Sequence, residues 1–340
     1  MEKPRTHWLG RLIAAPVVVY ALAVAAWVIA HELWGDSFWL LGLVNALAVY
    51  LFAPLPVMAL LALLARRRVA WVSLAVAALL LVGLFWGELT PPVPIVRAGD
   101  DTPTLTAMTY NVLFQVGDIA PIASSIAQAE PDLIAFQEMT YLRAQALEQV
   151  MGDQYPYRTP IDPHVCFTTV ATWSRYPILR IEAVDPDVAC RLTSVVVDFN
   201  GTPVRVVNVH AWPYTRTDQE SIERSFRWRQ EQIELVFSMV EGQPEPLLLL
   251  GDFNSAPMSD LYQTITGRYT DAFTKAGWGL GHTWPAEGGE WYHVPHPARF
   301  VRIDYVFYSD EWRAEDAWVA EWDGASDHHP VVARLRLSAR

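Results

Sequence analysis

Long apolar runs dominate the first quarter of the chain, and short alternating segments follow after residue 90. Between residues 12 and 87 the charged residues form two clusters, Glu32 with Asp36 and Arg66–Arg68. These clusters leave three apolar runs, residues 12–30, 38–65 and 69–87. Each run is close to or above the roughly 20 residues that cross a bilayer. The pattern therefore predicts a membrane anchor in residues 1–89, built from three transmembrane helices.

The charges that flank these runs predict an orientation. Basic residues favour the cytoplasmic side of a membrane, and they lie within residues 3–11 and again at Arg66–Arg68. The third helix then leaves the cytoplasm. We expect a multi-pass plasma-membrane protein with a cytoplasmic N-terminus and an extracytoplasmic remainder. Pro54 and Pro56 are expected to kink the second helix. A cleaved signal peptide is disfavoured because two more apolar runs follow the first.

Residues 90–103 are rich in proline and polar residues and predict a linker. From residue 104 to 340 the pattern changes to short strands and amphipathic helices, which indicates an α/β catalytic domain. The predicted helices cover residues 118–130, 141–151 and 220–239. The predicted strands cover residues 105–111, 133–137, 167–174, 193–199, 204–210, 247–250, 301–308 and 331–337.

Two local signals refine this pattern. Asn200-Gly201 between two strands indicates a β-hairpin, although Thr202-Pro203 can lengthen its loop. In the helix at 220–239, the three arginines at positions 224, 227 and 229 are interpreted as its solvated face.

The candidate chemistry begins with residues 247–254. Four leucines predict a strand that is buried on both faces, and Gly251-Asp252-Phe253-Asn254 follows them directly. A carboxylate can bind a hard cation or accept a proton, and a carboxamide can hold a phosphoryl oxygen. A simple Asx turn explains the tetrapeptide equally well when it is taken alone.

Other polar residues lie at or beside predicted strand ends. The full set is Asn111, Glu138, His210, Asp252, Asn254, Asp304, Asp327 and His328. Each has an ordinary explanation by itself, such as a helix cap or a packed histidine. Because a sheet gathers its strand ends at one edge, we expect the set to converge on one pocket.

Charge and cysteine content narrow the class of protein. The first 90 residues carry six Lys/Arg and four Asp/Glu, so the net charge of −12 leaves −14 for residues 91–340. Proteins that grip nucleic acid usually show a basic face, and a nucleic-acid partner is therefore not expected. Cys166 and Cys190 lie in the part predicted to be exported, where a disulfide and two free thiols are equally compatible with the sequence.

The strand-end motifs resemble those of the endonuclease/exonuclease/phosphatase superfamily, which has the deoxyribonuclease I-like fold. The matching pieces, in the family's order, are Thr-Tyr-Asn111, Phe-Gln-Glu138, Asn-Val-His210, Gly-Asp252-Phe-Asn254, Arg-Ile-Asp304-Tyr and Ser-Asp327-His328-His-Pro. The resemblance covers about residues 104–338 and implies a four-layer α/β/β/α sandwich of two mixed sheets. Leu113 stands where abasic-site endonucleases have an acidic residue, which disfavours that branch.

The resemblance also implies roles for the residues. Glu138 resembles the principal metal ligand, with Asn111 and Asp327 beside the same ion. The oxygen ligands favour Mg²⁺, with Mn²⁺ as the alternative. His328 and Asp304 resemble the catalytic pair that acts on water or phosphoryl oxygens. Asp252 would position or deprotonate the attacking water, and Asn254 would hold a nonbridging oxygen. His210 would lie near the leaving group or the transition-state oxygens.

The membrane-anchored arrangement is similar to bacterial members associated with teicoplanin resistance. This likeness implies a metal-dependent hydrolase of a lipid-linked phosphate, such as undecaprenyl pyrophosphate, and the bilayer as a partner. His282 and Trp284 form the candidate substrate-side loop. An exported deoxyribonuclease I-like nuclease and a non-catalytic membrane-anchored binding module remain the alternatives, and the choice among monoester, diester and pyrophosphate stays open.

Overall fold

The computed structural model describes residues 5–92, 103–115, 117–182, 184, 188–214, 216, 218–291, 294–322 and 324–338. The chain forms two compact units. The first contains Met1–Thr90 with Met258–Asp260, and the second contains Pro91–Pro257 with Leu261–Arg340. Most of the predicted linker, residues 93–102, lies outside the described residues.

Helices make up the first unit. They are α1 (Arg5–Trp34), α2 (Trp39–Ala46), the 3₁₀ helix η1 (Ala48–Phe52), α3 (Leu55–Ala65), α4 (Arg68–Leu84) and α5 (Trp86–Leu89). By length and composition, two segments are able to cross a membrane, Trp8–Trp34 and Ala48–Ala65. Large apolar side chains remain exposed on α1, including Val19 and Leu22 at 64% each.

The second predicted span differs from the structure. Residues 38–65 do not form one continuous helix, because α2 ends at Ala46 and α3 starts only after Pro54. Proline lacks the amide hydrogen that a helix interior needs, and Pro54 and Pro56 are accommodated where α3 begins. The third predicted span corresponds to α4, which has 17 residues and is shorter than the roughly 20 residues of a typical crossing.

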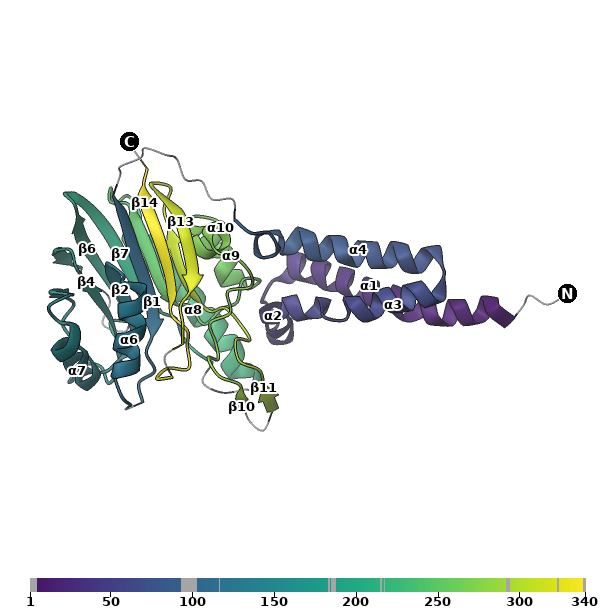
Figure 1. Ribbon diagram of the computed structural model, residues 1–340, viewed down its shortest axis with the longest axis horizontal. Coiled ribbons are helices and arrows are strands. Elements are labelled where there is room, and N and C mark those ends of the chain that lie inside the picture. Colours follow the sequence, from purple (N-terminus) through teal and green to yellow (C-terminus); the bar gives the residue numbers. More distant parts are fainter. Residues whose placement is uncertain are drawn as a thin grey trace. The chain divides into compact units, whose positions relative to one another are not determined.

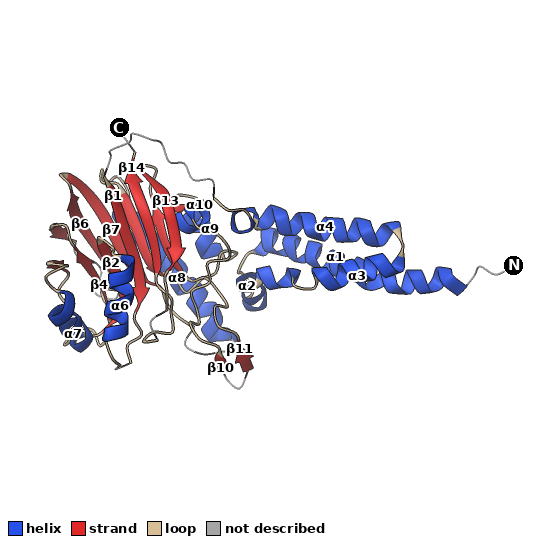
Figure 2. Cartoon of the chain, in the orientation of Figure 1, coloured by secondary structure: helices blue, strands red, loops and turns tan. Residues whose placement is uncertain are grey.

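Two six-stranded mixed sheets form the second unit (Figure 2). The strand order of the first sheet is β13-β14-β1-β2-β4-β3, and the order of the second is β5-β6-β7-β8-β12-β9. The strand bounds are β1 (Thr104–Asn111), β2 (Leu133–Met139), β3 (Tyr157–Arg158), β4 (Thr169–Ser174), β5 (Ile178–Ile181), β6 (Leu192–Phe199), β7 (Thr202–His210), β8 (Leu247–Asp252), β9 (Thr270–Asp271), β12 (Asp304–Tyr308), β13 (Trp312–Val319) and β14 (Val331–Leu337). A separate hairpin pairs β10 (Gly289–Trp291) with β11 (Val294–His296).

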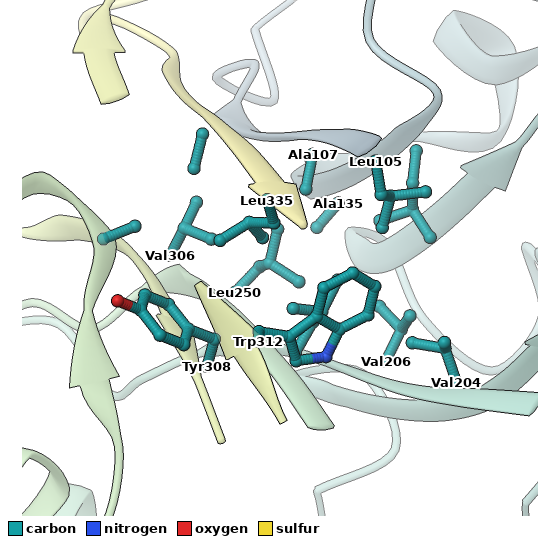
Figure 3. Packing of buried hydrophobic residues seen from close by; sticks show 14 of the residues in the cluster. Leu105, Ala107, Ala135, Val204, Val206, Leu250, Val306, Tyr308, Trp312 and Leu335 are labelled. Atoms are coloured by element: carbon teal, nitrogen blue, oxygen red, sulfur yellow. The ribbon is translucent and has the colours of Figure 1, made fainter. Parts of the chain in front are cut away.

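The two sheets pack face to face with helices on their outer faces (Figure 1). These helices are α6 (Ala120–Ala129), α7 (Tyr141–Met151), α8 (Gln219–Val240) and α9 (Asp260–Thr266). The short helix α10 (Ala272–Ala276) instead contributes Ala272, Phe273 and Ala276 to the core between the sheets. The inner core joins Leu105 and Leu335 of the first sheet to Val206 and Leu250 of the second (Figure 3). The expected α/β fold with two mixed sheets is therefore confirmed.

Strand β8 shows how the pattern produces these layers. Successive strand residues point to opposite faces, so Leu248 and Leu250 enter the inter-sheet core while Leu247 and Leu249 pack beneath the helices outside. All four are at most 4% exposed. The burial of each leucine side chain contributes about 2 kcal/mol to the stability of the fold. The four leucines therefore stabilise the strand that carries Asp252 in the middle of the sandwich.

The predicted hairpin at Asn200-Gly201 is confirmed, and its loop is not lengthened, because Phe199 pairs with Thr202 in the ladder. Both loop residues have positive φ, 52° and 84°, as the tight hairpin turn requires. The sequence pattern missed β13. Its alternation is broken by a bulge between Ala314 and Asp316, and only Trp312 and Ala317 are buried.

Candidate active site

Strand ends from both sheets meet at one edge of the sandwich. Strand β1 runs parallel to β2, and β7 runs parallel to β8, so Asn111, Glu138, His210 and Asp252 emerge at the same edge. Strand β12 begins there, because Asp304 pairs with Asp252. Backbone pairing therefore gathers Asn111 with Glu138 in one sheet, and His210, Asp252 and Asp304 in the other.

Asn111 links the two sheets. Its Nδ2 donates to Oε1 of Glu138 at 3.2 Å and to Oδ2 of Asp252 at 3.0 Å. Nε2 of His210 lies 3.8 Å from Oε1 of Glu138 and 3.7 Å from Oδ2 of Asp252. Asn111, His210 and Asp252 are all buried. The amide thus holds two carboxylates close together that would otherwise repel each other.

A second group surrounds His328. Its Nδ1 lies 2.9 Å from Oδ2 of Asp304, and its Nε2 lies 3.8 Å from Oδ2 of Asp252. Asp327 approaches Nε2 from the other side at 4.0 Å and accepts a hydrogen bond from Nε1 of Trp284 at 3.2 Å. Trp284 therefore contacts the site through Asp327.

The two histidines have opposite protonation preferences. Burial, together with the charges of Arg191 and His328, lowers the pKa of His210 well below its ordinary value. Burial also acts to lower the pKa of His328, but the charges of Asp304 and Asp252 outweigh it and raise that pKa to about 10. At neutral pH the site thus contains a neutral His210 and a protonated His328.

Asp252 lies between these groups and is itself perturbed. Burial and the charge of Asp304 raise its pKa to about 7, although the charge of His328 and a hydrogen bond from Asn111 oppose the increase. Such a carboxylate can exchange a proton near neutral pH, which is the property a general base needs.

Glycine is required immediately before Asp252. Gly251 has a φ of +155°, and a Cβ at this position would lie 1.9 Å from the carbonyl oxygen of Val209 on the neighbouring strand. No side chain fits in that space. Glycine at position 251 therefore allows β8 to lie close against β7 at the residue before Asp252.

The loop after β1 supports Glu138. The amide of Phe114 donates to Oε2 of Glu138 at 3.1 Å, and the guanidinium of Arg143 donates to the carbonyls of Val112 and Leu113. Leu113 and Glu138 both have positive φ, 52° and 54°. Conformations of this kind are uncommon for residues other than glycine and are typical of functional sites.

Arg229 is a buried supporting residue that the sequence analysis misplaced. The interpretation of a solvated arginine face is wrong for this position, because Arg229 is only 2% exposed. Its Nη1 donates to the carbonyl of Asn254 and to Oγ of Ser255. The Asn254 side chain donates to the carbonyl of Ala211 at 3.1 Å. Arg229 therefore holds the turn that follows Asp252.

Arg191 is the cation that the sequence analysis missed. It immediately precedes β6, and its carbonyl accepts a hydrogen bond from the amide of His210. Its guanidinium lies 4.2 Å above the ring of Trp212. Burial lowers its pKa, while the nearby charges of Glu138 and Asp252 oppose this effect. Its Nη1 is buried without a hydrogen-bond partner among the described residues, so one donor of the guanidinium is left unsatisfied.

The Asn200-Gly201 hairpin contains the signal that could have located Arg191. A two-residue loop pairs Phe199 with Thr202 and, at the far end, Leu192 with Val209. The same register places the next residue, Arg191, opposite His210. Extending the strand register from the turn would therefore have predicted that Arg191 lies beside the site.

His282 does not join the described cluster. Its Nδ1 is 2.8 Å from the carbonyl oxygen of Arg299, and its ring lines a separate pocket of about 590 Å³ with Trp278 and Arg299. Trp284, two residues later, is the member of the predicted pair that contacts the site through Asp327.

The residues fit a divalent cation. Carboxylate oxygens of Asp252 and Asp304 lie within 4.8 Å of each other. Oδ1 of Asp304 is buried without a hydrogen-bond partner in the described part of the chain. Glu138 adds a third carboxylate, which shares the amide of Asn111 with Asp252. Carboxylate-rich donor sets suit hard cations, and a cation would relieve the repulsion among these buried groups.

The three predicted metal ligands lie in two parts of the site. Asn111 donates a hydrogen bond to Glu138. The side chain of Asp327 contacts His328 and Trp284.

The fold and the site together define a deoxyribonuclease I-like α/β protein with an acidic and histidine-lined centre, a class whose members are generally phosphoester hydrolases. The chain belongs to the Endonuclease/Exonuclease/phosphatase family, whose model matches residues 108–328. A comparison with curated protein sequences gave no match.

Solved structures share this fold at low sequence identity. An endonuclease/exonuclease/phosphatase from Bacteroides vulgatus is 20% identical with a TM-score of 0.53, and the alignment covers 69% of this chain and 100% of that one. A family protein from Bacteroides thetaiotaomicron is 18% identical with a TM-score of 0.54, covering 70% and 100%. The mannosyl-6-phosphatase of the same organism is 18% identical with a TM-score of 0.51, covering 68% and 99%.

Proposed function

We propose that this protein is a membrane-anchored, Mg²⁺-dependent hydrolase that removes phosphate from a lipid-linked phosphate or pyrophosphate at the outer face of the membrane. The observation that carries the proposal is the buried group of Asp252, Asp304 and His328, which pairs a base with a protonated acid. The apolar helices of the same chain favour a substrate that resides in the bilayer.

Each residue has a task that its surroundings suit. Asp252, with a pKa of about 7, accepts a proton from the attacking water. Protonated His328 donates a hydrogen bond to a phosphoryl oxygen, and Asp304 holds its imidazole in place at 2.9 Å. The unpartnered Nη1 of Arg191 binds a second oxygen of the phosphate. Asn254 holds a nonbridging oxygen.

Glu138 and Asn111 would hold the cation, with Asp327 at the edge of the site, which leaves Asp252 to accept the proton. When bound, the cation supplies positive charge that balances the charge developing on the phosphoryl oxygens. Neutral His210 lies 3.7 Å from Asp252 and is placed to approach the leaving group without adding a competing positive charge.

The proposed membrane arrangement has three crossings, with α1 first, η1–α3 second and α4 third. The 17 residues of α4 span about 26 Å, and local thinning of a bilayer accommodates such a shortfall. The disulfide Cys166–Cys190 supports an extracytoplasmic catalytic unit, because disulfides persist outside the reducing cytoplasm. Protease added to intact spheroplasts is expected to cleave this unit, and complete protection would contradict the arrangement.

The activity is tested with the purified full chain and Mg²⁺ on undecaprenyl pyrophosphate, phospholipids and plasmid DNA. We expect phosphate release from the polyprenyl substrate, and a loss of at least about 100-fold in Glu138→Ala. Glu234→Gln, which changes an exposed carboxylate on α8, is the matched control. A wild-type protein that nicks DNA but is inert on every lipid phosphate would replace this function with the nuclease alternative.

A further inference from the structure

Three apolar side chains remain exposed beside the site. Phe114 is 43% exposed, Val165 is 67% exposed and Phe167 is 78% exposed. The rings of Phe114 and Phe167 pack edge to face with their centroids 6.0 Å apart. We call these three residues the apolar rim. Water-exposed aromatic rings are unfavourable unless a partner covers them.

The apolar rim is joined to the site at two points. The amide of Phe114 donates to Oε2 of Glu138 at 3.1 Å, so one end of the rim lies beside a proposed cation ligand. Cys166, between Val165 and Phe167, is bonded to Cys190, with 5.7 Å between their Cα atoms. Cys190 immediately precedes Arg191. The rim therefore lies between Glu138 and Arg191, the two groups that flank the phosphate position in the proposed mechanism.

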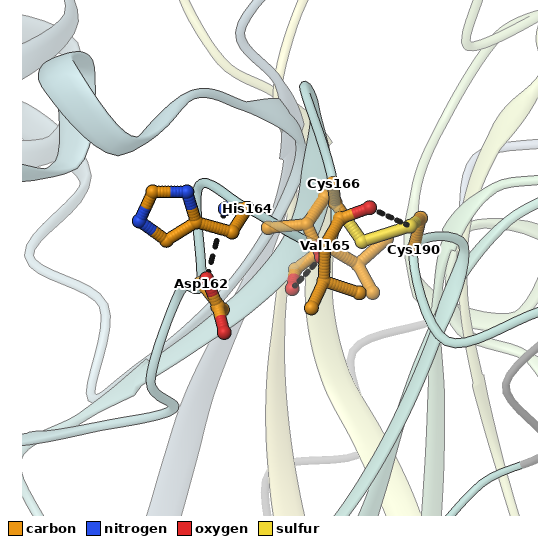
Figure 4. Close-up of a disulfide and its surroundings, with 7 residues drawn as sticks. Asp162, His164, Val165, Cys166 and Cys190 are labelled. Carbon is orange, nitrogen blue, oxygen red and sulfur yellow. Dashed lines mark hydrogen bonds between the residues drawn. A yellow bond between two sulfur atoms is a disulfide. The ribbon is translucent and has the colours of Figure 1, made fainter.

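The loop that carries the rim is held in a defined shape (Figure 4). The amides of Val165 and Cys166 both donate to the carbonyl of Asp162 at 3.2 Å, and the amide of His164 donates to the Asp162 side chain at 2.8 Å. These bonds and the disulfide constrain the backbone on both sides of Val165 and immediately before Phe167. A preorganised apolar surface binds a ligand at a smaller entropic cost than a flexible one.

We propose that the apolar rim binds the hydrocarbon chain of the substrate, next to the phosphate that the site cleaves. The inference rests on the proposed function and specifies how the site selects lipid-linked substrates. The small apolar surface of three side chains suits one hydrocarbon chain better than the surface of a bilayer. In addition, residues 91–340 carry a net charge of −14, which disfavours docking onto an anionic membrane.

The test measures binding of the hydrocarbon chain separately from turnover of the substrate. Full-length protein in zwitterionic lipid nanodiscs is titrated by calorimetry with octylphosphonate and with ethylphosphonate, which are not hydrolysed. In Phe167→Ser we expect the Kd for octylphosphonate to rise about tenfold, because one aromatic contact with the chain is lost. The Kd for ethylphosphonate is expected to stay unchanged, and Phe167→Leu is expected to retain most of the octyl affinity.

Val150→Ser is the matched control. Val150 is 60% exposed near the end of α7, about 13 Å along the helix from its first residue, Tyr141. Serine and valine have similar helix propensities, so the substitution is not expected to disturb the helix. Equal affinities of wild type and Phe167→Ser for octylphosphonate would overturn the inference, as would an equal loss for both ligands. Turnover is measured separately on undecaprenyl pyrophosphate. If binding depends on the length of the hydrocarbon chain but no turnover is seen, the proposed function is overturned. The inference that the apolar rim binds a hydrocarbon chain is then still supported.

Discussion

Replacing Asp304 with asparagine tests the buried pair that Asp304 forms with His328. Oδ2 of Asp304 lies 2.9 Å from Nδ1 of His328, and the side chains are 1% and 6% exposed. Asparagine keeps the shape of the side chain and removes its negative charge. The variant therefore isolates the charge that keeps the imidazole protonated.

The size of the effect follows from the surroundings of His328. Burial by itself lowers the pKa, and the charges of Asp304 and Asp252 raise it to about 10 from 6.5. One pKa unit corresponds to about 1.4 kcal/mol, so the raised pKa represents roughly 5 kcal/mol in favour of the imidazolium. Without Asp304, burial would be opposed mainly by Asp252. We then expect His328 to be largely neutral at pH 8.

The assay is kcat measured across neutral and alkaline pH. In the wild type, the acid form of His328 persists until the pH approaches about 10. In Asp304→Asn the activity that depends on it is expected to be lost from near neutral pH upward, with kcat about 100-fold lower at pH 8. The contribution of protonated His328 to the free energy of unfolding changes with pH in the same direction as the activity. It is complete below pH 6.5 and is lost as the pH rises through about 10.

Asp310→Asn is the control, because Asp310 is an exposed acid in the turn after β12. It should leave kcat and the pH profile unchanged. If Asp304→Asn keeps the wild-type kcat and profile at pH 8, then Asp304 does not hold His328 in its protonated form, and the assignment of His328 as the acid is wrong.

Three further predictions concern the groups around this pair. Arg191→Met is expected to lower kcat/KM about 100-fold by removing a cation from the phosphate position, and an unchanged kcat/KM would exclude that role. Arg229→Met is expected to lower the free energy of unfolding by about 3 kcal/mol, because the carbonyl of Asn254 and Oγ of Ser255 lose their buried donor. Chemical denaturation measures this change. The double variant Cys166→Ser, Cys190→Ser is expected to lose about 3 kcal/mol through a less constrained unfolded chain, and a midpoint equal to that of the wild type would contradict this estimate.

Local patterns predicted the elements that carry the site. Helix α7 occupies the predicted residues 141–151, and the helix predicted at 220–239 became α8 (Gln219–Val240). These predictions succeeded because apolar periodicity, caps and turn residues act within a few positions of the chain. Asp218 illustrates this, since its side chain caps α8 by accepting from the amide of Ser221 at 3.1 Å.

Interpretations that required knowledge of a distant partner were less reliable. Arg229 was assigned to a solvated helix face, because charge is normally exposed and its carbonyl partner at Asn254 is 25 positions away. Strand β13 was missed because its register with β14, including the bulge, depends on pairing across the sheet edge and not on its own alternation. Proline in residues 38–65 was expected to bend a helix, whereas it marks the point where a new one begins.

The sequence by itself determined which polar groups reach the edge of the sandwich, because strand ends and Gly251-Asp252 can be recognised locally. Only the tertiary structure decided how those groups act. The pKa of His328 depends on burial and on charges from Asp304 and Asp252, which no local pattern contains. Likewise, the disulfide joins two cysteines that are 24 residues apart, and Phe114 packs on Phe167 from a different loop of the chain. Electrostatic and packing energies depend on distance in space, and the fold alone sets that distance.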